Sequence, residues 1–259
     1  MIKFENTEAM GWEAAIRGMR NPMNSWEKSD SHPCNILKEL TDKNYSYRCA
    51  GCKNESAGRP NCTVIGPNDK KLMITLRNAG MDHRKFMRMI TVYVDITAPL
   101  YWWKEFDTYK VGTVANSCST MHKIADKEFI IDDFSHEHLK RFDYDLSMND
   151  SVESCIDASG FHDGGVLYSP FGILNLTIKS LNACRKKYLD TKDKKYWWQM
   201  IQLLPSSYNQ RRTVMLNYEV LANMYKSRKN HKLDEWHTFC DWIESLPYSE
   251  LITGEEGDD

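Results

Sequence analysis

Apolar residues recur three or four positions apart along much of the chain, which is typical of helices that bury one face. This spacing predicts helices over residues 7–20, 68–80, 135–146, 171–189, 194–204, 208–226 and 233–246. Residues 89–96 carry β-branched side chains at most positions and predict a strand. The polar or glycine-rich stretches 24–66 and 151–168 predict loops. We therefore expect an α+β fold, mainly helical with a small sheet, in a single domain over residues 1–259 with an insert at about 30–63.

The composition supports a globular protein, because the 259 residues are 41% hydrophobic and 27% charged. No apolar run approaches the ~20 residues of a membrane-spanning helix, and charged side chains interrupt the aromatic segment 98–123. The N-terminal residues MIKFENTEAM lack the apolar core of a signal peptide. The net charge of -2 gives no whole-surface attraction to nucleic acid. We expect a soluble cytoplasmic protein with neither a membrane nor a nucleic acid as its partner.

Four of the eight cysteines, Cys34, Cys49, Cys52 and Cys62, lie close together in the sequence. Cys49 and Cys52 form a C-x-x-C turn, which allows two thiolates to bind one zinc ion, and the other two could complete a tetrahedron. The spacing around the central pair is loose, so an irregular insert with free thiols is an equal alternative.

Two groups of polar residues are candidates for binding. His83 and Arg84 precede the predicted strand and could bind a phosphate or carboxylate, although a solvated turn is the commoner explanation of such residues. Asn217 and Asn223 lie within the predicted helix 208–226, where asparagine is unfavourable, and their amides suit the edge of a pyrimidine or flavin ring. Exposed asparagines on a helix are the alternative.

Arg211 and Arg212 lie near the start of the same predicted helix. Adjacent helical residues project about 100° apart, so at most one of the two arginines can face a cleft. A bound phosphate and a structural ion pair would both account for them, and the ion pair is the commoner arrangement.

The order of these features resembles the flavin-dependent thymidylate synthases. The resemblance is carried by His83, the strand 89–96 with the aromatic run after it, and Asn217, Asn223 and Arg228 near the C-terminus. It implies a flavin-dependent thymidylate synthase-like fold with a small antiparallel sheet. It further implies that His83 contacts the flavin, that Asn217 and Asn223 surround it, and that Arg228 orients a pyrimidine.

The signature motif of that family, which begins Arg-His-Arg, is altered in this chain. The triplet falls on Thr108-Tyr109-Lys110, so Lys110 is the only cation left in the motif, and Glu219 stands where another arginine is expected. The loss of three charge-assisted contacts would weaken phosphate binding by roughly three to six powers of ten. The nucleotide- or flavin-binding residues that we predict are His83, Arg84, Glu105, Tyr109, Lys110, Thr113, Asn116, Ser119, Arg211, Asn217, Asn223 and Arg228.

Three hypotheses follow. The first is a nucleotide-binding protein with lost or altered catalysis, which sequesters a nucleotide-derived ligand, as in phage counter-defence. The second is an active enzyme that uses FAD for the reductive methylation of dUMP. The third is an interaction protein stabilised by zinc. The resemblance also implies a homotetramer, and no catalytic residue is assigned.

Overall fold

The computed structural model describes residues 2–33, 63–140 and 169–254. The chain forms two compact units. The smaller contains Ala98–Trp103 and Cys118–Gln210, and the larger contains Ile2–Thr97, Lys104–Ser117 and Arg211–Asp259. The four clustered cysteines and the predicted loop 151–168 lie outside the described residues. The single domain that we expect over the whole chain stays a prediction.

The central element is a four-stranded sheet in the order β1-β4-β6-β5. Its strands are β1 (Lys3–Met10), β4 (Thr91–Pro99), β6 (Asn209–Asn217) and β5 (Val114–Ser117). The pairs β1–β4 and β5–β6 are antiparallel, as expected for the small sheet of this fold class. A separate two-stranded sheet pairs β2 (His32–Pro33) with β3 (Thr63–Val64).

The predicted strand is confirmed as β4, in which Val92, Val94 and Ile96 are buried on one face. The predicted helix 7–20 is only partly right, because α1 covers Trp12–Arg20 and the residues before it form β1. Gly11 separates the two with a φ of 92°. A Cβ at this glycine would lie 2.1 Å from the carbonyl oxygen of Met89, so only glycine fits here.

The predicted helix 208–226 is wrong over its first half. Residues 209–217 form β6, and α8 (Tyr218–Arg228) begins only after Asn217. Gln210, Val214 and Leu216 are buried at every second or fourth position, so the buried positions alternate as in a strand. The alternating burial of the strand is followed without a break by the helical spacing of α8, so the two patterns together resemble one continuous helix.

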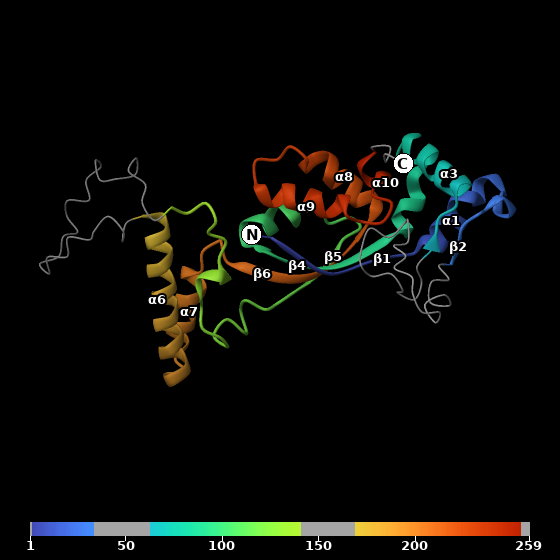
Figure 1. Cartoon of the computed structure of the whole chain (residues 1–259). Helices are drawn as coiled ribbons and strands as arrows, with labels where there is room; N and C mark the ends of the chain where they lie inside the picture. Colours follow the sequence, from blue (N-terminus) through green and yellow to red (C-terminus); the bar gives the residue numbers. More distant parts are fainter. Residues whose placement is uncertain (1, 34–62, 141–168, 255–259) are drawn as a thin grey trace, which may run out of the picture. The chain divides into compact units, whose positions relative to one another are not determined.

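The remaining helices of the larger unit agree with the predicted spacing. They are α3 (Pro67–Asn78) and α9 (Asp234–Glu244), and α10 (Glu250–Thr253) follows them. Figure 1 shows α8 and α9 on one side of the strands. Phe4 of β1 stacks on Trp242 of α9 with ring centroids 4.9 Å apart, so this helix covers an apolar face of the strand.

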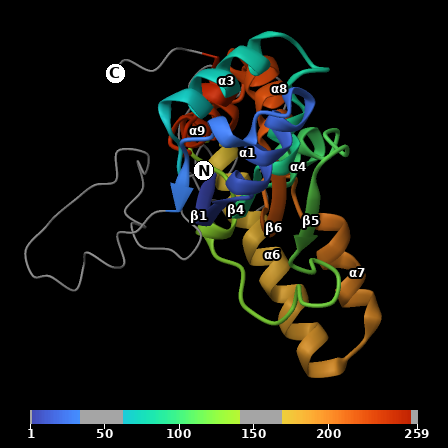
Figure 2. The same ribbon diagram turned by 90° about the vertical axis from the view of Figure 1, so that its right-hand side faces the viewer.

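The smaller unit is built on the helical hairpin of α6 (Pro170–Thr191) and α7 (Lys194–Leu203), which lie side by side and antiparallel in Figures 1 and 2. Both helices were predicted. Its core contains Ile124, Ala125, Phe129, Phe134, Leu174, Ile178, Leu181 and Met200. The predicted helix 135–146 is wrong over residues 135–140, where the chain has turns and Ser135 N donates to Ser207 O at 2.8 Å.

Short helical segments complete the described chain. They are α4 (Leu100–Phe106), η1 (Asn21–Met23), η2 (Trp26–Lys28), η3 (Arg84–Met89) and η4 (Ile131–Asp133). Trp102 and Phe106 of α4 are buried. No helix in the described part of the chain is long and apolar enough to cross a membrane.

Candidate functional site

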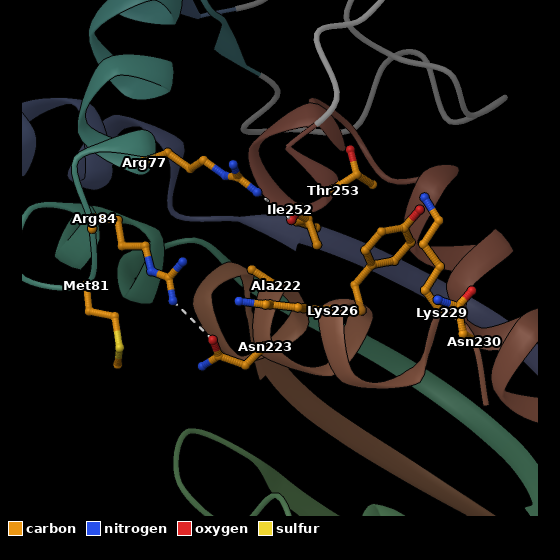
Figure 3. A pocket seen from close by; sticks show the side chains of 12 residues that line it. Arg77, Met81, Arg84, Ala222, Asn223, Lys226, Lys229, Asn230, Ile252 and Thr253 are labelled. Carbon is orange, nitrogen blue, oxygen red and sulfur yellow. Dashed lines mark hydrogen bonds between the residues drawn. The ribbon is translucent and has the colours of Figure 1, made fainter.

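A pocket of about 490 Å³ lies within the larger unit, next to α8. We call it the α8 pocket. The turn after α3 supplies Met81, η3 supplies Arg84, α8 supplies Asn223 and Lys226, and α10 supplies Thr253 (Figure 3). The other lining residues are Arg77, Gly80, Ala222, Tyr225, Lys229, Asn230 and Ile252.

The charge of the α8 pocket is its main chemical feature. Arg77, Arg84, Lys226 and Lys229 line it, and no carboxylate is among its described lining residues. Lys226 makes no ion pair with any residue that the structure describes. A concave site with several cations focuses an attractive field on an anion. The α8 pocket is therefore suited to a ligand with phosphate or carboxylate groups.

Arg84 is held in the α8 pocket from two sides. Its Nη2 donates to Oδ1 of Asn223 at 3.0 Å (Figure 3), and its Nε lies 3.5 Å from Oε1 of Glu219. Glu219 is buried and also accepts a hydrogen bond from Arg88. Its hydrogen bond and charge raise the pKa of Arg88. One carboxylate thus serves two guanidinium groups, so the pair of arginines keeps a net positive charge.

Arg77 is fixed by main-chain oxygens. Its Nε and Nη2 both lie 3.4 Å from carbonyl oxygens of α10, those of Leu251 and Ile252. Burial, and then repulsion by Arg84, lowers the pKa of the Arg77 guanidinium. A lowered pKa means that the positive charge is costly here, so an anion in the α8 pocket would relieve that cost.

Arg228 lies on a different face of α8, in a group that we call the Glu105 cluster: Glu105, Tyr109, Arg228, His231 and Trp236. Oε2 of Glu105 lies 2.6 Å from Nη1 of Arg228, 3.1 Å from Nε1 of Trp236 and 3.3 Å from Nε2 of His231. Nε of Arg228 donates to the Tyr109 hydroxyl at 2.9 Å. The guanidinium also lies 4.5 Å from the centre of the Trp236 ring. The charge of Arg228 is thus neutralised within the larger unit.

The other predicted residues near α8 have local structural contacts. Asn217 is the N-cap of α8, with Oδ1 accepting from Val220 N at 2.9 Å, which explains an asparagine at this position. Its Nδ2 lies 3.4 Å from Gly112 O. The Thr113 hydroxyl donates to Tyr109 O, and Asn116 pairs with Thr213 in the β5–β6 ladder.

His83, Lys110 and Ser119 are not brought together with the α8 pocket. His83 is exposed at the start of η3, and Lys110 is exposed in the segment before β5. Ser119 belongs to the smaller unit, where its hydroxyl accepts from His122 N at 2.9 Å. Roles for these three side chains remain predictions.

Arg211 and Arg212 lie on a strand, so their side chains point to opposite faces and not 100° apart. Both form the ion pairs that the sequence favoured: Arg211 with Asp95 at 2.8 Å, and Arg212 with Asp107 at 2.7 Å. Hydrogen bonds from Thr213, Arg211 and Asn6 lower the pKa of Asp95 to about 2.

The structure adds three cations that we did not predict as site residues: Arg77, Lys226 and Lys229. Asn223, Lys226 and Asn230 follow one another at helical spacing, and this was the available signal. No group of three or more His, Cys, Asp or Glu side chains in the described ranges could hold a metal ion. Zinc therefore has no support there.

No family model matches the sequence, and no curated protein matches it. A crystal structure of thymidylate synthase X from Helicobacter pylori with FAD and dUMP matches with a TM-score of 0.59 and 13% identity, over 98% of each chain. The fold is that of the flavin-dependent thymidylate synthases.

Two further structures are similar. A second flavin-dependent thymidylate synthase complex from Helicobacter pylori, also with FAD and dUMP, has a TM-score of 0.57 and 13% identity over 98% of each chain. A UMP/dUMP methylase from Streptomyces cacaoi, bound with 5-Br dUMP, has a TM-score of 0.49 and 10% identity, over 98% of this chain and 94% of the other.

Proposed function

We propose that this protein binds a nucleotide-derived ligand, with its phosphate groups in the α8 pocket, and that the methylation chemistry of its structural relatives is lost or altered. The observation that carries the proposal is the set of four lining cations without a lining carboxylate among the described residues. The volume of about 490 Å³ lies within the range of small-molecule sites. Guanidinium groups suit charge-assisted hydrogen bonds to a phosphate, and the lysines act as point charges.

Two features support the loss or alteration of catalysis. Arg228, which the resemblance assigns to the pyrimidine, is engaged by Glu105 at 2.6 Å. Glu219 replaces an expected arginine and supplies a buried negative charge. Both features reduce the positive charge available to a substrate phosphate or pyrimidine. They leave the phosphate-binding capacity concentrated in Arg77, Arg84, Lys226 and Lys229.

An FAD-dependent synthase is the second candidate, because the two Helicobacter pylori structures that share this fold were determined with FAD and dUMP. Arg84 and Lys226 would hold the phosphates of a flavin nucleotide in the α8 pocket, and the flavin ring would supply the redox chemistry. We further propose that the protein assembles as a homotetramer. FAD is the weaker of the two candidates because of the altered motif and the engaged Arg228.

The absorbance spectrum of the purified protein, with mass spectrometry of what it releases on denaturation, separates the two candidates. We expect no flavin absorbance and either a released nucleotide or, in calorimetry, binding of an added nucleoside phosphate. Visible flavin absorbance together with rescue of a thymidine-requiring strain would establish the active synthase instead.

Arg84→Gln tests whether the α8 pocket is the site, with Lys85→Gln as the matched control at the neighbouring exposed position. One charge-assisted hydrogen bond is worth about 1.5–3 kcal/mol, so Arg84→Gln is expected to weaken nucleotide binding by about 10- to 150-fold. Lys85→Gln is expected to leave affinity unchanged. Equal effects of the two substitutions would contradict the assignment.

A further inference from the structure

The end of the α6–α7 hairpin carries a concentration of positive charge that the nucleotide pocket does not use. Residues 185–195 contain six lysines and arginines against two carboxylates, a local net charge of +4 in a chain of net charge -2. Lys186, Lys187, Lys192 and Lys194 are exposed, and none of them forms an ion pair with a described residue. We call residues 185–198 the hairpin tip.

An exposed aromatic surface lies beside these lysines. Trp198 is 47% exposed, and its indole N–H has no hydrogen-bond partner in the described ranges. Trp197 supports it edge-on, with ring centroids 4.9 Å apart and planes at 74°. Trp197 is itself fixed, because its Nε1 donates to Met121 O at 2.9 Å. The exposed indole is thus a preorganised platform and not a loose side chain.

Cation and platform are close enough to act together. Nζ of Lys194 lies 5.8 Å from the centre of the Trp197 ring and 6.0 Å from that of Trp198. We propose that the hairpin tip binds single-stranded nucleic acid, with a base stacked on Trp198 and neighbouring phosphates on Lys194 and the other free lysines. Stacking platforms that alternate with backbone-binding cations are how sequence-independent single-strand binders work.

Two other anionic partners fit less well. Insertion into an anionic membrane requires apolar residues at the apex, but the turn of the hairpin consists of Thr191, Lys192 and Asp193. An acidic peptide would satisfy the lysines but would leave the exposed face of Trp198 without a role. The net charge of -2 for the whole chain is compatible with the proposal, because the positive charge that attracts the nucleic acid is local to the hairpin tip.

Fluorescence anisotropy of the full-length protein with a labelled oligothymidylate of about 12 nucleotides tests the proposal. Trp198→Ala is expected to weaken binding by about tenfold. Lys194→Gln is expected to weaken it and to reduce the slope of log affinity against log salt by about 0.7. The control variants Trp26→Ala, at a tryptophan 51% exposed in the larger unit, and Lys179→Gln, earlier on α6, should bind like the unaltered protein.

Further measurements keep the result specific. A duplex of the same length should bind less tightly than the single strand, because its paired bases are not free to stack on Trp198. The proposal is overturned by an absence of oligonucleotide binding at low salt, or by equal losses in Trp198→Ala and Trp26→Ala. Binding to phosphatidylserine vesicles that depends on Trp198, without oligonucleotide binding, would establish a membrane surface instead. Circular dichroism confirms that each variant is folded.

Discussion

Glu105→Gln tests whether Arg228 is a structural residue of the Glu105 cluster. The substitution keeps the size of the side chain but removes the charge from the oxygen that lies 2.6 Å from Arg228 Nη1. A charge-assisted hydrogen bond is worth about 1.5–3 kcal/mol. The Glu105 side chain is 34% exposed and that of Arg228 16%, so solvent screening reduces the expected coupling to about 1–2 kcal/mol.

A double-mutant cycle of Glu105→Gln and Arg228→Gln, followed by urea unfolding, measures this coupling. Arg228→Gln also removes the guanidinium from the Trp236 ring, which adds about 0.5–1 kcal/mol to that single variant without entering the coupling with Glu105. The matched control is the cycle of Glu13→Gln and Arg17→Gln. That pair is 3.9 Å apart with side chains 59% and 69% exposed, and about 0.3–0.5 kcal/mol is expected.

A coupling at the Glu105 cluster no larger than that of the control pair would refute the reasoning. The functional corollary is that Arg228→Gln leaves nucleotide affinity within about twofold of the unaltered protein, since Arg228 is not among the residues that line the α8 pocket. A loss of nucleotide affinity in Arg228→Gln as large as that in Arg84→Gln would show that Arg228 contributes to nucleotide binding.

Three further predictions concern stability and assembly. Because the hydrogen bonds that it accepts lower the pKa of Asp95 from 3.8 to about 2, its contribution to stability is present above pH 3.8 and is lost as the pH falls to 2. Acid titration of the unfolding free energy should therefore show a smaller loss in Asp95→Asn. Gly112→Ala should destabilise the protein by about 1 kcal/mol or more, because Gly112 has a φ of 80° and a Cβ there would lie 2.7 Å from Nδ2 of the helix cap Asn217; thermal unfolding measures this. If the proposed homotetramer buries α6, Ile173→Glu with Leu176→Glu, at positions 53% and 43% exposed, should reduce the mass measured by light scattering, whereas Lys179→Glu should not.

Periodicity predicted the helices that are long and have an apolar face, such as α6 and α9, because their pattern continues for several turns. It was wrong for β1, where Lys3–Met10 pair with β4. A local pattern contains no information about a partner strand nearly ninety residues away. For the same reason β6 could not be predicted from the local sequence. Its Arg211 and Arg212 form ion pairs with Asp95 and Asp107, which lie in other parts of the chain.

The residues that line the α8 pocket are harder to predict than the fold for a related reason. Arg84 and Asn223 were singled out separately, but their hydrogen bond joins residues 139 positions apart. Arg77 was overlooked because an arginine in the last turn of a helix is ordinary, and it becomes notable only when α10 places two carbonyl oxygens beside it. The resemblance assigns Arg228 to the pyrimidine, whereas its contact with Glu105, which lies in another element, cannot be read from the local sequence.

The geometry of α8 explains why its two cations Lys226 and Arg228 have different surroundings: Lys226 lines the α8 pocket, and Arg228 contacts Glu105. Asn223 and Lys226 lie three residues apart on α8 and line the α8 pocket, whereas Arg228 is five residues after Asn223, about 140° around the helix axis. The face of Arg228 meets a carboxylate and two aromatic rings. The buried carboxylate of Glu219, at the start of α8, lies beside Arg84 and Arg88. Because Glu219 neutralises one charge of two, it can hold Arg84 against Asn223 and still leave the α8 pocket positive. Under the proposed function, the carboxylate at this position therefore leaves Arg84 as a cation of the α8 pocket for the proposed anion.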